Sequence, residues 1–240
     1  MRDYKEETTR RVEFIKDILA KSGAKGIVYG NSGGKDCTLV GILCKMACEN
    51  TVGVIMPCGT SRNYESDKED ALKVGKQFRI EQREVDLIST KAELLKACST
   101  ATTETDGAIV NVAPRLRMAT LYLIAASEGR LVAGTGNRSE AYVGYFTKWG
   151  DGAHDFNPIS DLTVTEIYEF LHYLGAPKSI IDKAPSAGLK EGQTDEGEMG
   201  ISYATLDRYI LTGEGDEKDI EVIERLHKAS HHKRHPIKKF

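Results

Sequence analysis

Two spacings of apolar residues run along this chain and predict alternating strands and helices. Short apolar runs at 26–29, 52–56 and 131–135 predict buried strands, and the alternating pattern of 81–87 predicts another. Apolar residues at helical spacing predict helices at 8–21, 39–46, 66–78, 114–125, 163–174 and 205–210. This order predicts a three-layer α/β/α fold, a doubly wound and mostly parallel sheet with helices on both faces. We expect residues 1–240 to form a single domain with a C-terminal helical extension.

The helix predicted at 114–125 is apolar on more than one side. Pro114 suits its first turn, and the positions that follow leave no broad polar face. Such a helix is expected to be buried all round, either within one subunit or in a dimer. Because packing on a sheet uses only one stripe of a helix, the pattern favours a homodimer.

Composition places the chain among globular proteins and limits its partners. Of 240 residues, 40% are hydrophobic and 29% are charged, and the formal net charge is -3. This balance gives no general attraction to nucleic acid or to an anionic membrane. Charges run through the first predicted helix and no later apolar run approaches a membrane span, so we expect a cytoplasmic protein. The five cysteines form no Cys-x-x-Cys pair, which predicts free thiols.

The stretch Tyr29-Gly30-Asn31-Ser32-Gly33-Gly34-Lys35-Asp36-Cys37 joins the first predicted strand to the next helix. Paired glycines let successive backbone N–H groups point inward, and the helix start adds the positive end of its dipole. The stretch therefore predicts a phosphate-binding loop. The kinase-type loop is excluded, since Tyr29 and Asp36 stand where that motif has Gly and Ser or Thr. The alternative interpretation is a plain glycine-rich turn.

Two carboxylates are candidates for a divalent metal site. Asp36 follows the first predicted strand and Glu140 follows the strand predicted at 131–135. Both therefore stand at carboxyl ends of parallel strands, where ligands bind in α/β sheets. Together they could share one Mg²⁺. The alternative for Glu140 is a solvated carboxylate at a helix start, where acidic residues are favoured.

Ser32, Gly33, Gly34 and Asp36 resemble the pyrophosphate loop of the N-type ATP pyrophosphatases, which cut ATP between its α and β phosphates to adenylate a substrate. Three further stretches, 111–118, 140–152 and 185–196, are similar to the ammonia-dependent NAD synthetases, and the resemblance covers nearly the whole chain. It implies amidation of deamido-NAD with ammonia through an adenylated carboxylate, releasing AMP and pyrophosphate. It also implies Mg²⁺ as cofactor and ATP as cosubstrate.

The same resemblance implies a set of site residues. Asp36 and Glu140 would be the catalytic metal ligands. ATP would contact Gly30, Asn31, Ser32, Gly33, Gly34, Lys35, Asp36, Cys37, Thr135 and Ser186. Deamido-NAD would contact Arg115, Lys148, Asp155, His232 and Lys233. The last two would reach it across a dimer interface, although 227–239 taken alone is only a basic, solvated tail.

Two positions depart from the family pattern. Val164 stands where the family usually has a lysine on an ATP phosphate, so either Lys35, Lys190 or another cation compensates or ATP binding is weaker. Cys37 replaces a serine beside the phosphates. At a helix N-terminus next to Lys35, it is either a reactive thiol with a lowered pKa or a small buried residue.

Two loops are predicted outside the regular elements. Segment 183–200, rich in Gly, Pro and acidic residues, is a predicted lid. Segment 99–106 is polar without an apolar period and is predicted to be a mobile surface loop.

Other functions fit less well. A tRNA-thiolating adenylase would need paired cysteines and a basic face, and the sequence has neither. A non-catalytic nucleotide-binding module would give Glu140, Lys148 and Asp155 no reason to converge. A glutamine-using synthetase would need a further hydrolase domain, for which 240 residues leave no room. Free ammonia is the expected nitrogen donor, with a separate glutaminase as the alternative source.

Overall fold

The computed structural model describes residues 2–59, 64–183, 194–237 and 239. Its sheet has four strands, all parallel, in the order β3-β2-β1-β4. They are β1 Gly26–Gly30, β2 Thr51–Ile55, β3 Glu81–Glu84 and β4 Arg130–Ala133. β3 is shorter than the predicted 81–87, because its partner β2 ends just before Pro57, which has no N–H to continue the ladder.

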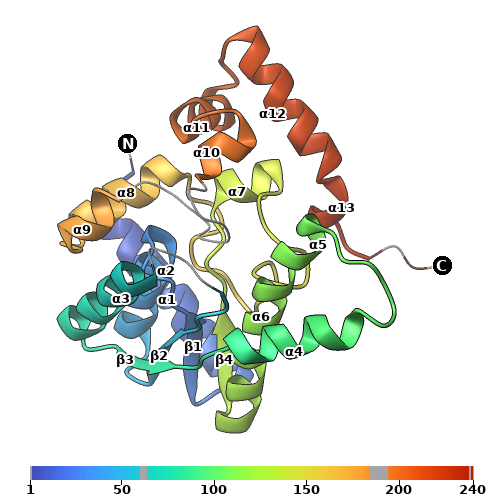
Figure 1. The fold of residues 1–240 in the computed structure, drawn as a ribbon. Helices are drawn as coiled ribbons and strands as arrows, with labels where there is room; N and C mark the ends of the chain where they lie inside the picture. The colour runs from blue at the N-terminus through green and yellow to red at the C-terminus, as the bar shows by residue number, and fades with distance from the viewer. Residues whose placement is uncertain (1, 60–63, 184–193, 238, 240) are drawn as a thin grey trace.

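Successive residues of β1 face opposite sides of the sheet. Ile27 and Tyr29 belong to one apolar cluster and Val28 to a second. The first cluster is covered by α1 Tyr4–Ser22, α2 Lys35–Ala47, α3 Tyr64–Phe78 and α8 Val164–Tyr173. The second is covered by α6 Val112–Glu128, and α4 Ile88–Cys98 contacts α6 (Figure 1). The predicted α/β/α layering is confirmed.

The C-terminal helices lie beyond the carboxyl ends of the strands, at the top of Figure 1. The remaining helices are α5 Asp106–Val110, α7 Arg138–Val143, α9 Lys178–Ile181, α10 Asp195–Met199, α11 Tyr203–Thr212, α12 Glu217–Ala229 and α13 His231–Arg234. A third apolar cluster, which includes Leu206 and Ile223, holds α7, α10, α11 and α12 together. The basic segment 227–239 is therefore not simply a solvated tail. His227 Nδ1 and Arg234 Nη1 lie 2.8 and 3.0 Å from Tyr142 O.

α6 is longer than predicted and less buried. Its buried residues are Ala113, Pro114, Leu121 and Ala125. Leu123, on the outer side, is 68% exposed, which excludes the less favoured of the two alternatives, burial on all sides within one subunit. By length and composition, Asp106–Glu128 could pass for a membrane span. In the fold, however, α6 packs along β1 and β4 as a helix that covers a sheet.

Candidate active site

The loop after β1 has the backbone geometry of a phosphate cradle. Asn31 organises it, because its Oδ1 accepts hydrogen bonds from Gly33 N at 3.1 Å and from Cys37 Sγ at 3.3 Å. Gly33 has a φ of +71°, and a Cβ there would lie 2.1 Å from Asp67 O, so only glycine fits. α2 begins at Lys35, and the first N–H groups of a helix have no acceptor within it. These groups are available to an anion.

The loop opens into a cavity of about 1240 Å³ at the carboxyl ends of β1, β2 and β4. The predicted site residues that line it are Gly30, Asn31, Ser32, Gly34, Lys35, Asp36, Cys37, Thr135, Glu140 and Lys233. The fold therefore brings the predicted ATP and metal residues together. Of the other predicted site residues, Gly33, Arg115, Lys148, Asp155 and His232 are not among the lining residues. Ser186 and most of the predicted lid lie outside the described residues.

Asp36 and Glu140 are linked by a side chain that the sequence analysis missed. Asn137 Nδ2 donates to Asp36 Oδ1 at 3.0 Å. Asn137 Oδ1 accepts from Glu140 N at 2.9 Å, and Asn137 N donates to Glu140 Oε2 at 3.1 Å. The last two bonds form the capping box that starts α7. Asn137 thus fixes both carboxylates, and its signal in the sequence was an Asn placed three residues before a Glu.

The charged groups Lys35, Asp36 and Glu140 at this end of the cavity include more carboxyl groups than cations. Burial and the negative charge of Asp36 raise the pKa of Glu140 above its usual range. Lys35 Nζ lies 2.8 Å from Asp36 Oδ2. Burial opposes its charge, but the two carboxylates outweigh that effect and raise the pKa of Lys35. Two carboxylates therefore face one ammonium.

This donor set fits Mg²⁺ bound together with a nucleotide. Mg²⁺ commonly uses one or two protein carboxylates and completes its shell with substrate phosphates and water. Among the described residues, no group of three or more His, Cys, Asp and Glu could hold a metal ion. Asp36 and Glu140 are therefore suited to a metal that arrives with phosphate rather than to a closed protein cage.

Cys37 is a buried thiol. It is 3% exposed, and its Sγ donates to Asn31 Oδ1 and to Gly34 O, the latter at 3.2 Å. Burial raises the pKa of this thiol in spite of its hydrogen bonds with Ser32. Of the two alternatives for Cys37, the structure favours the small buried residue over the thiol with a lowered pKa, because desolvation outweighs the helix N-terminus and the neighbouring ammonium is paired with Asp36. Cys37 therefore acts as a small residue that fills the serine position.

Val164 is 3% exposed and belongs to the third apolar cluster. Its N–H donates to Ser139 Oγ at 3.2 Å, which places the start of α8 against α7. This position therefore supplies packing where the family pattern has a cation. Lys190, one of the predicted substitutes, lies outside the described residues.

Three of the residues expected to hold deamido-NAD lie together near the C-terminus. Arg115 Nη2 donates to Lys148 O at 3.3 Å, and Lys148 Nζ donates to His232 O at 2.6 Å. The adjacent Lys233 lines the cavity, and its Nζ donates to Phe146 O at 2.6 Å. A basic group from α6, the 147–153 turn and α13 therefore forms within one chain.

Asp155 is set apart from this group. Its Oδ2 accepts from Val132 N at 2.7 Å, and its Oδ1 accepts from Tyr122 OH at 3.2 Å. The carboxylate is thus bonded to the edge of β4 and to α6. In this arrangement Asp155 supports the sheet, and a contact with substrate would need an additional partner for one of its oxygens.

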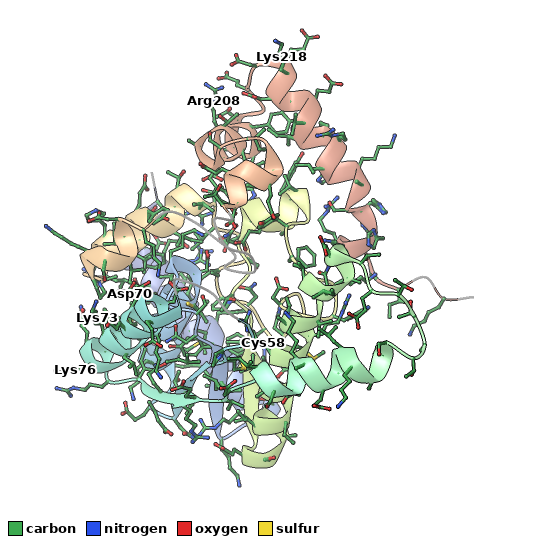
Figure 2. All side chains as sticks on the ribbon, in the orientation of Figure 1. Cys58, Asp70, Lys73, Lys76, Arg208 and Lys218 are labelled. Atoms are coloured by element: carbon green, nitrogen blue, oxygen red, sulfur yellow. The ribbon has the colours of Figure 1, made fainter. Side chains whose placement is uncertain are left out.

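Arg117 is a cavity residue that the sequence analysis did not single out. Its Nε donates to Met56 O at 3.0 Å, and it forms no ion pair with any described residue. Burial lowers the pKa of its guanidinium. Cys58, another lining residue, marks this end of β2 in the middle of Figure 2, whereas Arg208 and Lys218 lie on the outer helices. The negative charge of Asp151 acts on Arg117 without forming an ion pair, so this guanidinium is suited to an anionic ligand in the cavity.

The sequence has known counterparts along its whole length. The family model described as NAD synthase matches residues 7–237. An NH3-dependent NAD+ synthetase of Carboxydothermus hydrogenoformans is 44% identical over 235 residues, covering 97% of this chain and 96% of that protein. One of Archaeoglobus fulgidus is 42% identical over 236 residues, covering 97% and 94%.

The fold has matching solved structures. An NMN synthetase from Francisella tularensis has a TM-score of 0.94 at 34% identity, covering 100% of this chain and 99% of its own. An NH3-dependent NAD synthetase from Campylobacter jejuni has a TM-score of 0.82 at 30% identity, covering 100% of each. Matched in sequence and in fold from end to end, the chain is an enzyme of the NAD synthase family.

Proposed function

We propose that the cavity binds ATP and deamido-NAD side by side and that Asp36 and Glu140 hold a magnesium ion there. As a member of the NAD synthase family, the enzyme amidates deamido-NAD to NAD with ammonia and ATP. The observation that carries the site proposal is the pair of carboxylates joined by Asn137 beside the phosphate loop. Bound magnesium would screen the phosphates and the pyrophosphate that leaves.

The reaction has two steps. A carboxylate oxygen of deamido-NAD forms a bond to the α-phosphorus of ATP, while the bond from that phosphorus to the β-phosphate oxygen breaks and pyrophosphate leaves with the electron pair. Ammonia then forms a bond to the carbonyl carbon, the bond to AMP breaks, and the nitrogen loses a proton to give the amide. The loop N–H groups at the start of α2 are placed to stabilise the charge on pyrophosphate.

We assign the remaining residues by the same site. Thr135 and Ser186 contact ATP together with the loop residues 30–37. Deamido-NAD is held by Arg115, Lys148, Asp155, His232 and Lys233. The position of Asp155 is fixed by its hydrogen bond from Val132 N in β4. Arg117, which lines the cavity and forms no ion pair with a described residue, binds an anionic group of one of the substrates.

The test is to mix protein, ATP, Mg²⁺, deamido-NAD and ammonium and to measure AMP, pyrophosphate and NAD. All three products should appear in equal amounts. Without ammonium, AMP release should fall while pyrophosphate still forms up to about one equivalent per site, because the adenylated intermediate accumulates. If no AMP and no pyrophosphate form, the proposed function is wrong.

A second candidate substrate is nicotinate mononucleotide, which would be amidated to NMN. The TM-score of 0.94 to the Francisella tularensis NMN synthetase favours testing it. The chemistry at the carboxylate is identical, so the two substrates differ only in what the basic group at the C-terminus must hold. Comparison of kcat/KM for the mononucleotide and for deamido-NAD decides between them.

We also propose that the enzyme is a cytoplasmic homodimer and that residues 1–240 act as one domain. The outer face of α6, with Leu123 68% exposed, is apolar and available to a second copy. All five cysteines are free thiols, which suits a reducing compartment that supplies ATP. Sedimentation of wild type and Leu123→Glu tests the dimer. A wild-type monomer at micromolar concentration with full activity would contradict it.

A further inference from the structure

Lys35 is an unusual lysine because its charged end is inside the protein. It is the first residue of α2, and its side chain is 6% exposed. Its Nζ lies 2.8 Å from Asp36 Oδ2 and 5.5 Å from the centre of the Tyr203 ring. Lysine is rarely buried unless it is paired, so Asp36 fixes the ammonium at the wall of the cavity.

This ammonium occupies the place where a metal would compete for Asp36. Asp36 accepts from Asn137 through Oδ1 and from Lys35 through Oδ2, so both of its oxygens are engaged. Each oxygen keeps a second lone pair, but the ammonium at 2.8 Å would repel a divalent ion that binds Asp36, so metal binding favours movement of Lys35 away from this carboxylate. Lys35 has the flexible four-carbon stem that allows such a movement, whereas Asn137 is held by its capping box.

Three other lysines of the cavity, Lys68, Lys183 and Lys233, are engaged by protein groups. Lys183 Nζ lies 2.6 Å from Asp67 Oδ1, and Lys68 Nζ lies 2.6 Å from Glu84 Oε2. Lys233 Nζ donates to two backbone carbonyls. Of these lysines, only Lys35 lies at the start of α2, where the loop N–H groups converge. Its side chain is therefore within reach of a phosphate bound there.

We propose that Lys35 is an exchangeable cation of the metal site, which holds Asp36 before substrate binds and transfers to the phosphates when Asp36 takes a metal. This inference rests on the proposed function, since it assumes that phosphates enter this loop. Lys35 then serves two ends: it prevents two buried carboxylates from facing each other without a counterion, and it neutralises the pyrophosphate that leaves.

The transfer predicts two binding changes of opposite sign in Lys35→Met. Mn²⁺ alone, measured by electron paramagnetic resonance of the free ion, should bind about tenfold more tightly than to wild type, because no ammonium competes for Asp36. Magnesium pyrophosphate, measured by calorimetry, should bind about tenfold more weakly, because one charged hydrogen bond is lost. Lys45→Met is the matched control on the same helix, since Lys45 pairs with Glu49 at 2.6 Å, and it should change neither affinity.

Each result decides the proposal. Mn²⁺ affinity that does not rise in Lys35→Met overturns the exchange, and pyrophosphate affinity that does not fall overturns the transfer to phosphate. If Lys35→Met does not fold, Lys35→Gln is measured in the same way. Neither measurement uses deamido-NAD. Failure of wild type to make NAD would therefore contradict the proposed function, while these two affinities judge the role of Lys35.

Discussion

Two groups of charged side chains in this molecule differ in how fully they are paired. The N-terminal ionic cluster consists of Arg2, Glu7, Arg11 and Asp161. Arg11 lies 2.7 Å from both Glu7 and Asp161, and Arg2 lies 3.0 Å from Asp161. With Arg10, which pairs with Glu7, and Glu166, which pairs with Arg2, it has three cations and three anions, and it ties α1 to α8 and to the loop before it. None of its members lines the cavity.

The cavity cluster consists of Lys35, Asp36 and Glu140. It has one cation for two carboxyl groups, and Glu140 forms no ion pair within the part of the chain that the structure describes. Its carboxylate accepts a hydrogen bond from Asn137 N instead, and its own N–H donates to Asn137 Oδ1. Balanced charge therefore marks the cluster that holds the fold together. Unbalanced charge facing a cavity marks the cluster that awaits a ligand.

The largest effect is expected from Glu140→Gln. Glutamine keeps a side-chain oxygen for the capping bond from Asn137 N and has nearly the same volume as glutamate, so Tm should change by less than about 2 °C. Loss of the carboxylate from the metal site should lower kcat by roughly 10³-fold. Thermal melts and initial rates at saturating Mg²⁺ measure both. A large fall in Tm with unchanged kcat would place Glu140 with the structural cluster.

The converse is expected of Arg11→Met. This substitution leaves Glu7, whose side chain is 11% exposed, without its nearest cation, and should lower the free energy of unfolding by about 3 kcal/mol. Activity per folded molecule should be unchanged. Urea titration measures the loss, with Lys21→Met on the same helix as the control. Lys21 and its partner Asp17 are both exposed, so that change should cost less than about 0.5 kcal/mol.

Arg117→Met tests the opposite imbalance, a cation that forms no ion pair with a described residue. Removal of this guanidinium should lower kcat/KM by roughly 30-fold, because a charged hydrogen bond to substrate is lost. The unfolding free energy should change by less than about 1 kcal/mol, because losing the bond to Met56 O is offset by removing an uncompensated buried charge. Steady-state kinetics and urea titration separate the two effects. Unchanged kcat/KM would show that Arg117 does not touch substrate.

The fold was largely predictable because its signals are local. The apolar runs of β1, β2 and β4 and the glycine turn after β1 can each be predicted from the residues within that segment alone. The outer helices α4 and α12 were missed for different reasons: α4 has no buried residue, whereas the apolar stripe of α12 at Ile220, Ile223 and Leu226 was a signal that the sequence analysis did not use. The sequence could not decide how α6 is buried, since an apolar face does not say which molecule covers it.

Within the site, the residues that could be predicted are again those whose role follows from their neighbours in the sequence. The glycine loop and the two carboxylates follow strands directly. Asn137 and Arg117 gain their roles from residues about 100 and 60 positions away, Asp36 and Met56, and no sequence spacing shows that. The sequence could not decide the pKa of Cys37, because its neighbours in sequence, Lys35 and the helix start, were visible, whereas the depth of its burial was not.

The smallest effect is a pH dependence of the N-terminal ionic cluster. Burial alone would raise the pKa of Asp161, but the hydrogen bonds and charge of Arg11, with Arg2 beside it, hold that pKa below its usual value. A carboxyl whose pKa is lower in the folded than in the unfolded chain stabilises the fold above the unfolded value, about 3.9. That contribution is lost as the pH falls through the folded value.

Asp161→Asn should therefore be less stable than wild type at pH 6, and the difference should shrink as the pH falls below about 4. The side chain of Asp161 is 54% exposed, so the difference at pH 6 should stay below about 1 kcal/mol. Urea titrations of both proteins from pH 6 to about 3 measure it, at constant ionic strength because exposed pairs are screened by salt. A difference that grows on acidification would mean that Asp161 carries its proton in the fold, and the N-terminal ionic cluster would then be as unbalanced as the cavity cluster.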